Sequence, residues 1–276
     1  MRNISERKRQ PASSAHEGAG SFFNMIWTHN PVAGPVIATI VFLIAWQAAS
    51  LSMPVFLPGP IAAMRGGVEL FQNGQLLPYV GVTWYRVLLG WGVGVLLGIP
   101  TGWMIAQSNI VKRLVDPYIN FFRFIPPIIW VTIFLLWFGY NDVTRVLLVA
   151  YATFMICVIH GTVGIISIPN EKIRAAANLG VTGWELFRRV KIPAALPDAI
   201  TGMRVAMTNS FMTIIAVEML TASSGLGYLA WTSRLYFRLD FVFISIVILG
   251  LMGLVTDRIF RFLTLRYLRR YGVHFD

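Results

Sequence analysis

The sequence predicts an all-α, polytopic membrane protein with about six transmembrane helices, and its composition and apolar runs carry that prediction. Hydrophobic residues make up 56% of the 276 residues, the mean hydropathy is +0.66, and only 13% of residues are charged. A soluble domain carries roughly 25% charged residues, so this composition favours lipid. Six apolar runs approach the roughly 20 residues that a spanning helix needs. They are 31–52, 84–106, 121–139, 144–166, 199–220 and 240–262.

The basic residues predict an orientation with both termini in the cytoplasm. With the N-terminus inside, all but five of the 23 basic residues lie in the inner segments or the span ends beside them. The five exceptions are Arg65, Arg86, Arg145, Arg234 and Arg238. By the positive-inside rule, such a bias places the basic segments on the cytoplasmic side of the membrane. The net charge of +11 therefore indicates contacts with membrane lipids rather than with nucleic acid.

The first segments outside the spans are a tail and a short helix. Residues 1–20 are polar and predict a disordered cytoplasmic tail, which leaves 21–276 as the transmembrane domain. Residues 21–30 suit either an interfacial helix or a disordered approach to the first span. After that span, Pro58-Gly59-Pro60 breaks the chain, and a short outer helix follows.

The second span carries a stripe of glycines for helix packing. Small residues at every fourth position form a bare face that lets two helix backbones approach closely in lipid. Static packing and a pivot against a moving helix both fit this pattern. The stripe consists of Gly90, Gly94, Gly98 and Gly102.

The third and fifth spans supply candidates for a translocation pathway, because polar residues within spans are costly unless they line a cavity or pair. Two prolines, 126 and 127, delay or bend the third span before its polar position, Thr132. In the fifth span, Asn209, Ser210 and Thr213 bracket one face. Glu218, near the outer end, suits an ion pair with Arg145 or Arg234, or a gate.

The loop 168–198 predicts two short helices that form a docking surface. Asn170 suits the N-cap of a first helix from Glu171, and Gly180 suits its end. Thr182 and Glu185 have capping-box spacing for the second helix, and Pro193 closes the unit.

The same loop resembles a family signature. The series Arg174-Ala175-Ala176, three residues, then Gly180, with Pro193 thirteen positions later, is similar to E-A-A-x3-G-x9-I-x-L-P of bacterial ABC importer permease subunits. Arg174, Val190 and Ile192 replace the Glu, Ile and Leu of that pattern. The variant resembles the nitrate, sulfonate and taurine branch. Four further runs support the resemblance: 57–60, 86–102, 125–139 and 223–229.

The resemblance implies a fold, partners and a substrate class. It implies the type I permease fold of methionine importers, located as a multi-pass protein in the inner membrane. It implies a homodimer, two cytoplasmic ATPases on the two coupling loops (168–198), and an extracytoplasmic solute-binding protein. From the residues themselves, Trp184 and Phe187 on one side of the second helix can enter a cleft of a soluble partner, and Arg188 can pair with acids at its rim or with anionic lipid headgroups. The solute would be a small anion or zwitterion such as nitrate, a sulfonate or taurine.

The chain shows no catalytic residues, metal ligands or cofactor site of its own. No G-x-x-x-x-G-K-[ST] phosphate loop occurs, so ATP and magnesium would bind the partner ATPase. Two other functions stay open at this point. An ion-gradient-driven secondary transporter needs membrane acids, for which Glu218 is the candidate. A membrane scaffold without a pathway is the other, and the polar fifth span argues against it.

Overall fold

The computed structural model describes residues 33–268, and within that range it contains helices and no strand. The chain divides into two compact units, residues 1–62 and 63–276. In the first unit, α2 (Ala33–Ser52) is a 20-residue helix with almost all of its side chains exposed. Trp46 Nε1 donates to the carbonyl oxygen of Pro58 at 3.1 Å, which holds the following turn against this helix.

The remaining helices lie wholly or mainly in the second unit. They are α3 (Pro60–Gln72), α4 (Leu76–Ile105), α5 (Asn109–Arg123), the 3₁₀ turn η1 (Pro127–Trp130), α6 (Val131–Phe138), α7 (Asp142–Ile166), α8 (Asn170–Asn178), α9 (Gly183–Leu186), the π-helical turn η2 (Phe187–Lys191), α10 (Ile192–Thr221), α11 (Leu226–Leu235) and α12 (Leu239–Leu268). The expected tail, 1–20, and the expected interfacial helix, 21–30, fall outside the described residues.

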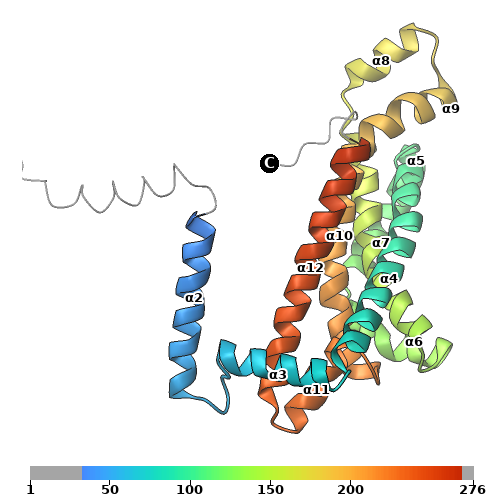
Figure 1. Cartoon of the computed structure of the whole chain (residues 1–276). Helices are drawn as coiled ribbons and strands as arrows, with labels where there is room; N and C mark the ends of the chain where they lie inside the picture. The colour runs from blue at the N-terminus through green and yellow to red at the C-terminus, as the bar shows by residue number, and fades with distance from the viewer. Residues whose placement is uncertain (1–32, 269–276) are drawn as a thin grey trace, which may run out of the picture. The chain divides into compact units, whose positions relative to one another are not determined.

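Long helices α4, α7, α10 and α12 run side by side, with α8 and α9 at one end and α11 at the other (Figure 1). A cluster of buried apolar side chains between them forms the main core. Its fully buried members include Leu70 from α3, Val87 from α4, Val149 from α7, Ile214 from α10 and Leu226 from α11. The core therefore ties the short helices at one end to the long ones.

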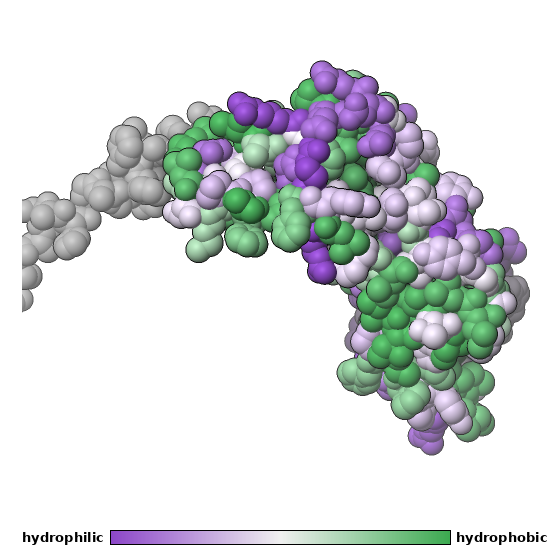
Figure 2. All heavy atoms as spheres, turned by 90° about the horizontal axis from the view of Figure 1, so that it is seen from below, coloured by the Kyte–Doolittle hydropathy of each residue, from purple (hydrophilic) through white to green (hydrophobic). Residues whose placement is uncertain are grey.

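Hydrophobic side chains also cover much of the outside. Figure 2 shows broad hydrophobic areas on the face that it views, interrupted by hydrophilic clusters. Large exposed apolar residues occur on most helices, among them Leu96, Met212 and Leu254. Apolar surface of this extent is unusual on a soluble protein and suits contact with lipid or with other membrane helices.

Five helices are long and apolar enough to cross a membrane, and a sixth span results if α5 and α6 are counted together. The fourth predicted span matches α7 closely. The second and fifth begin earlier than predicted, at Leu76 and at Ile192 or before, because further mostly apolar residues precede the predicted spans and continue the helices. The third predicted span, 121–139, is bent at its two prolines, as the sequence indicated. The helix axes bend by 86° between α5 and the η1–α6 segment, where Pro126 and Pro127 interrupt the hydrogen-bond ladder.

Candidate functional site

The coupling loop begins with α8, which ends as the sequence predicted but begins differently. Gly180 has φ +81°, its N–H donates to Ala177 O at 2.9 Å, and the N–H of Val181 donates to Ala176 O at 3.1 Å. This pair of bonds is the Schellman arrangement, which needs a residue tolerant of positive φ. Asn170 is not the N-cap. It is the first helical residue, because Pro169 before it already takes the capping position.

The second short helix, α9, lacks the predicted capping box. Thr182 is extended and precedes the helix, but its side chain makes no capping hydrogen bond. Gly183 has φ +57°, which is a left-handed conformation. The residue after an N-cap must already have right-handed helical dihedral angles, so the capping box does not form. Glu185 instead forms a 2.9 Å ion pair with Arg189, one turn along the helix.

Pro193 does not close this unit. Helical structure runs from Gly183 through η2 into α10, and Pro193 stands in the first turn of α10. A proline inside a helix has no N–H to donate and clashes with the carbonyl four residues earlier. The π-helical turn Phe187–Lys191 directly before Pro193 accommodates this clash by widening the helix. The coupling loop is thus a rigid extension of the span.

The aromatic residues of the coupling loop have different roles. Phe187 is buried and packs with Ile165, Ile168 and Ala195, so it anchors the loop and is not available to a partner. Trp184 stacks on it at a centroid distance of 5.1 Å yet stays 71% exposed. Leu179, at the end of α8, is 84% exposed. Arg174, Ala175, Thr182 and Arg188 are exposed as well, and Ala176 is half-buried.

The four glycines of the second span lie against α7. A Cβ at Gly90 would lie 2.6 Å from Val149 Cβ, and one at Gly98 would lie 2.7 Å from Cys157 Cβ. Gly94 meets Thr153, and Gly102 meets the backbone of residues 158–162, in the same way. The glycines therefore let α4 and α7 pack with their backbones nearly in contact.

The structure separates the predicted pathway residues. Ser210 is fully buried and its hydroxyl lies 2.8 Å from that of Thr153 on α7, so it joins two helices rather than lining a cavity. Thr213 is buried too. Thr132 is exposed on the short helix α6. Asn209 alone of the α10 set lines a cavity, of about 470 Å³, between α5, α7 and α10.

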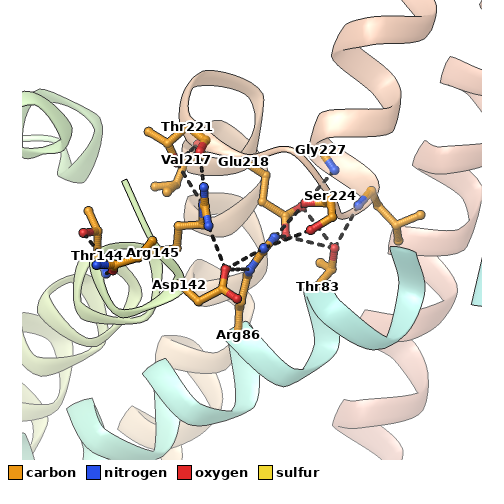
Figure 3. A network of polar contacts seen from close by, with 12 residues as sticks. Thr83, Arg86, Asp142, Thr144, Arg145, Val217, Glu218, Thr221, Ser224 and Gly227 are labelled. Atoms are coloured by element: carbon orange, nitrogen blue, oxygen red, sulfur yellow. Dashed lines mark hydrogen bonds and ion pairs between the residues drawn. The ribbon is translucent and has the colours of Figure 1, made fainter. Parts of the chain in front are cut away.

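Glu218 is fully buried, and its partner differs from both predicted arginines. Arg86 Nη1 donates to Glu218 Oε1 at 2.7 Å (Figure 3). The carboxylate also accepts from Thr83 Oγ1 at 3.0 Å and from the N–H of Gly227 at 2.9 Å. The predicted partner Arg234 stacks on Trp231 instead. A carboxylate satisfied by this many donors is poorly suited to carry ions, which argues against a secondary transporter.

Two arginines and two carboxylates form one neutral group at the end of the helices opposite α8. Asp142 Oδ1 accepts from Arg86 Nη2 at 2.6 Å and from Arg145 Nη1 at 2.7 Å. Arg145 Nη2 donates to the backbone oxygen of Thr221, and Arg86 Nη1 to that of Ser224 at 2.7 Å. We call Arg86, Asp142, Arg145 and Glu218 the four-charge cluster. It joins α4, α7, α10 and the start of α11.

Sequence reasoning did not pair Arg86, although the signal was present. An arginine inside an apolar run is rare in membrane helices and almost always has a partner. Arg86 lies in the predicted second span, and Glu218 is the carboxylate within the predicted fifth span. Matching these two charges would have identified the contact between the helices.

A second charged contact ties the loop before α12 to α3. Arg238 Nη2 lies 2.6 Å from Glu69 Oε2 and 2.9 Å from Asp240 Oδ2. Hydrogen bonds to Asp240, and then to Glu69, raise the pKa of Arg238 above its usual value, so it is charged at any physiological pH. Within residues 33–268 no group of His, Cys, Asp or Glu is arranged to hold a metal ion.

The comparisons with known proteins agree on one kind of protein. The family described as binding-protein-dependent transport system inner membrane component matches residues 94–269. A probable ABC transporter permease of Brucella melitensis is 33% identical over 214 residues, which are 78% of this chain and 87% of that protein. The taurine transport system permease of Escherichia coli is 27% identical over 80% of this chain and 84% of its own length.

Two further matches are a named permease and a solved structure. The nitrate import permease of Synechocystis is 27% identical over 84% of this chain and 88% of its own length. Among solved structures, an inward-facing methionine ABC transporter matches with a TM-score of 0.56 at 18% identity, covering 67% of this chain and 94% of that chain. At that identity the likeness shows the fold.

Proposed function

We propose a function on the premise that this chain belongs to the family of binding-protein-dependent transport system inner membrane components. It is the multi-pass, inner-membrane permease of an ABC importer, and such permeases act with an ATPase and a solute-binding protein.

The coupling loop is the part that receives the ATPase. Its two helices project beyond the long helices (Figure 1), and Leu179 and Trp184 offer exposed apolar side chains at the turn between them. Buried Phe187 and the continuous helix into α10 make a stiff lever. A displacement at the turn would therefore move α10 as one body. This lever is the single observation that carries the proposal.

ATP and magnesium act on the partner, and the chain itself is not an enzyme. The 276-residue sequence has no phosphate-binding loop, while the coupling loop offers the partner a rigid contact. ATP-driven closure of two ATPases would push two coupling loops together, so we propose a homodimer. The cavity beside Asn209 is a groove in one copy, and a second copy would close it into a passage.

The solute is a small anion or zwitterion. Relatives at 27–30% identity are named as permeases for taurine, aliphatic sulfonates and nitrate, and each aligns with at least 80% of this chain. These solutes share a compact oxyanion head group. A solute-binding protein would deliver the solute to the end of the helices that bears α11.

Purification of the tagged chain from its own membrane tests this function. We expect a soluble ATPase to purify with it, and ATP hydrolysis to require that partner. Vesicles that contain the complex should take up a sulfonate only with ATP and a solute-binding protein. Hydrolysis by the chain alone, or uptake driven by an ion gradient without ATP, would contradict the proposal.

A further inference from the structure

Two adjoining cavities form a groove along α5 that reaches from the break in the helices towards the coupling loop. The larger, of about 470 Å³, lies between the end of α5, α7 and α10. The smaller, of about 180 Å³, lies between α5 and the last turns of α7. Both are lined by Arg123 and Ile159, so they adjoin at these residues. We call the two cavities together the α5–α7 groove.

Arg123 is held at the junction of these cavities. It is the last residue of α5, directly before the 86° bend. Tyr151 on α7 donates to the backbone oxygen of Phe122 at 3.1 Å and fixes this last turn against α7. The guanidinium lies 4.9 Å from the centre of the Phe124 ring. No carboxylate within residues 33–268 forms an ion pair with it, in contrast to Arg86, Arg145 and Arg238.

The larger cavity combines one exposed cation, Arg123, with a lining that is mostly apolar. Its lining includes Phe122, Phe124, Met155, Ile156 and Val205. Arg123 is the only charged residue among the lining residues, and Asn209 and Tyr151 add an amide and a phenol. A guanidinium binds an oxyanion through two parallel hydrogen bonds, and apolar surroundings strengthen the attraction.

The smaller cavity differs in size and in the polarity of its wall. Lys112 and Asp116 line it one helical turn apart, so their charges offset each other, and Asn120 adds a polar group. Arg123 is shared by both cavities, so an anion paired with it has a polar wall on one side and a mostly apolar wall on the other. An apolar body favours the larger cavity, which has more space and the wider apolar wall.

We propose that Arg123 determines the substrate of this permease, and that the substrate is an organic monoanion with an apolar body, such as an alkylsulfonate. The head group would pair with Arg123, and the alkyl chain would lie against Phe124 and Met155. A bare inorganic oxyanion such as nitrate would leave most of these walls in contact with water. This inference rests on the proposed function, and it selects one class among the anions named there.

Direct binding to the purified complex tests the inference. The complex of this chain with its ATPase is placed in lipid nanodiscs without a solute-binding protein, so that any binding belongs to the permease. Isothermal titration then compares hexanesulfonate, nitrate and hexyltrimethylammonium. We expect hexanesulfonate to bind and the other two to bind at least about tenfold more weakly.

Two variants assign the effect to the guanidinium. Arg123→Gln should weaken hexanesulfonate binding roughly tenfold or more, while Arg123→Glu should favour hexyltrimethylammonium over hexanesulfonate. Arg113→Gln is the matched control, because Arg113 is an exposed arginine of the same helix that lines neither cavity. It should leave binding unchanged.

The same samples separate this inference from the proposed function. Assembly with the ATPase and ATP hydrolysis report on the function, and sulfonate binding reports on Arg123. A complex that assembles and hydrolyses ATP, but binds hexanesulfonate equally well with Arg123→Gln, would overturn the inference and leave the function standing. Equal or tighter binding of nitrate would also overturn it.

Discussion

Glu218 shows how strongly one side chain can depend on its neighbours in this fold. Its carboxylate is fully buried, and Arg86, Thr83 and the backbone of Gly227 supply its hydrogen bonds. Two charges removed from water are costly, and only good geometry offsets that cost. Removing Glu218 would leave Arg86 with Asp142, a half-exposed carboxylate, as its remaining charged partner.

We therefore expect Glu218→Ala to destabilise the protein by about 1–3 kcal/mol, because the buried donors of Thr83 and Gly227 would lose their acceptor while Arg86 keeps Asp142. Replacing both residues, as Arg86→Met with Glu218→Leu, should cost less than Glu218→Ala alone. The measurement is the temperature at which the detergent-solubilised protein loses its monodisperse peak on size exclusion. Additive losses in the double variant would show that the two residues act independently.

Gly225 lies directly beside the carboxylate of Glu218. Its φ is +111°, and a Cβ there would lie 2.6 Å from Glu218 Oε2. Both the backbone and the space thus require glycine. The position lies in the run 223–229, which supported only the family resemblance in the sequence. The need for glycine at position 225 follows from the nearby carboxylate of Glu218, which no local sequence pattern places there.

At the scale of elements, the contact between α4 and α7 depends on the glycine stripe. A Cβ at Gly98 would lie 2.7 Å from Cys157 Cβ and 2.9 Å from the carbonyl oxygen of Phe154. The two helices would have to separate to accept a methyl group there. Gly92, on the same helix, has no heavy atom within 4 Å of such a position.

We expect Gly98→Ala to lower stability by roughly 1–3 kcal/mol, as overpacked cores do. Gly92→Ala should be neutral or stabilising, since alanine favours a helix over glycine by up to about 1 kcal/mol. The same size-exclusion thermal assay compares the two. Equal losses would mean that helix propensity, and not close packing, governs the stripe.

The turn in the coupling loop offers a second element-scale prediction. Gly180 has positive φ and open space around it, so any effect of a substitution there comes from the backbone or from new charge. Gly180→Glu should abolish ATP-dependent uptake while the protein still inserts, because the backbone is strained and a carboxylate meets the partner. Gly180→Asn should retain most uptake, since asparagine tolerates this conformation best among non-glycine residues.

Uptake into vesicles and recovery of the ATPase with the tagged permease are measured in parallel. Near-normal uptake by the Glu variant would show that the turn does not transmit motion. Equal loss in both variants would indicate that the glycine is needed for a reason other than its backbone conformation.

The sequence predicted most elements because their signals are local. The fourth span, the helix after Pro60 and the end of α8 at Gly180 each follow from apolar length or from a glycine or proline. The prolines at 126 and 127 predicted a bend in the third span, but hydropathy gave neither its angle of 86° nor the beginning of α5 at Asn109. The capping box failed because Gly183 adopts a left-handed conformation that the residue type permits but does not require.

At the scale of the whole molecule, the pathway was the hardest feature to predict. Asn209, Ser210 and Thr213 share one broad face of a helix, and the sequence does not say which of them line a cavity and which pair internally. The hydroxyl of Thr153 on α7 contacts that of Ser210 on α10, whereas Asn209 lines the α5–α7 groove. Only the placement of the neighbouring helices resolves that choice.

The burial of Ser210 and Thr213 and the cavity beside Asn209 predict which of these positions water can reach. In a Cys157→Ala background, which removes the single native cysteine, Asn209→Cys should react with a membrane-impermeant thiol reagent in at least one nucleotide state. Ser210→Cys and Thr213→Cys should not, because both side chains are buried between helices. The rate at position 209 should change between ATP-bound and nucleotide-free complexes, since the two states open the passage to opposite sides. Labelling of 213 as fast as 209, or at 209 only by lipid-soluble reagents, would place the pathway on a different face of α10.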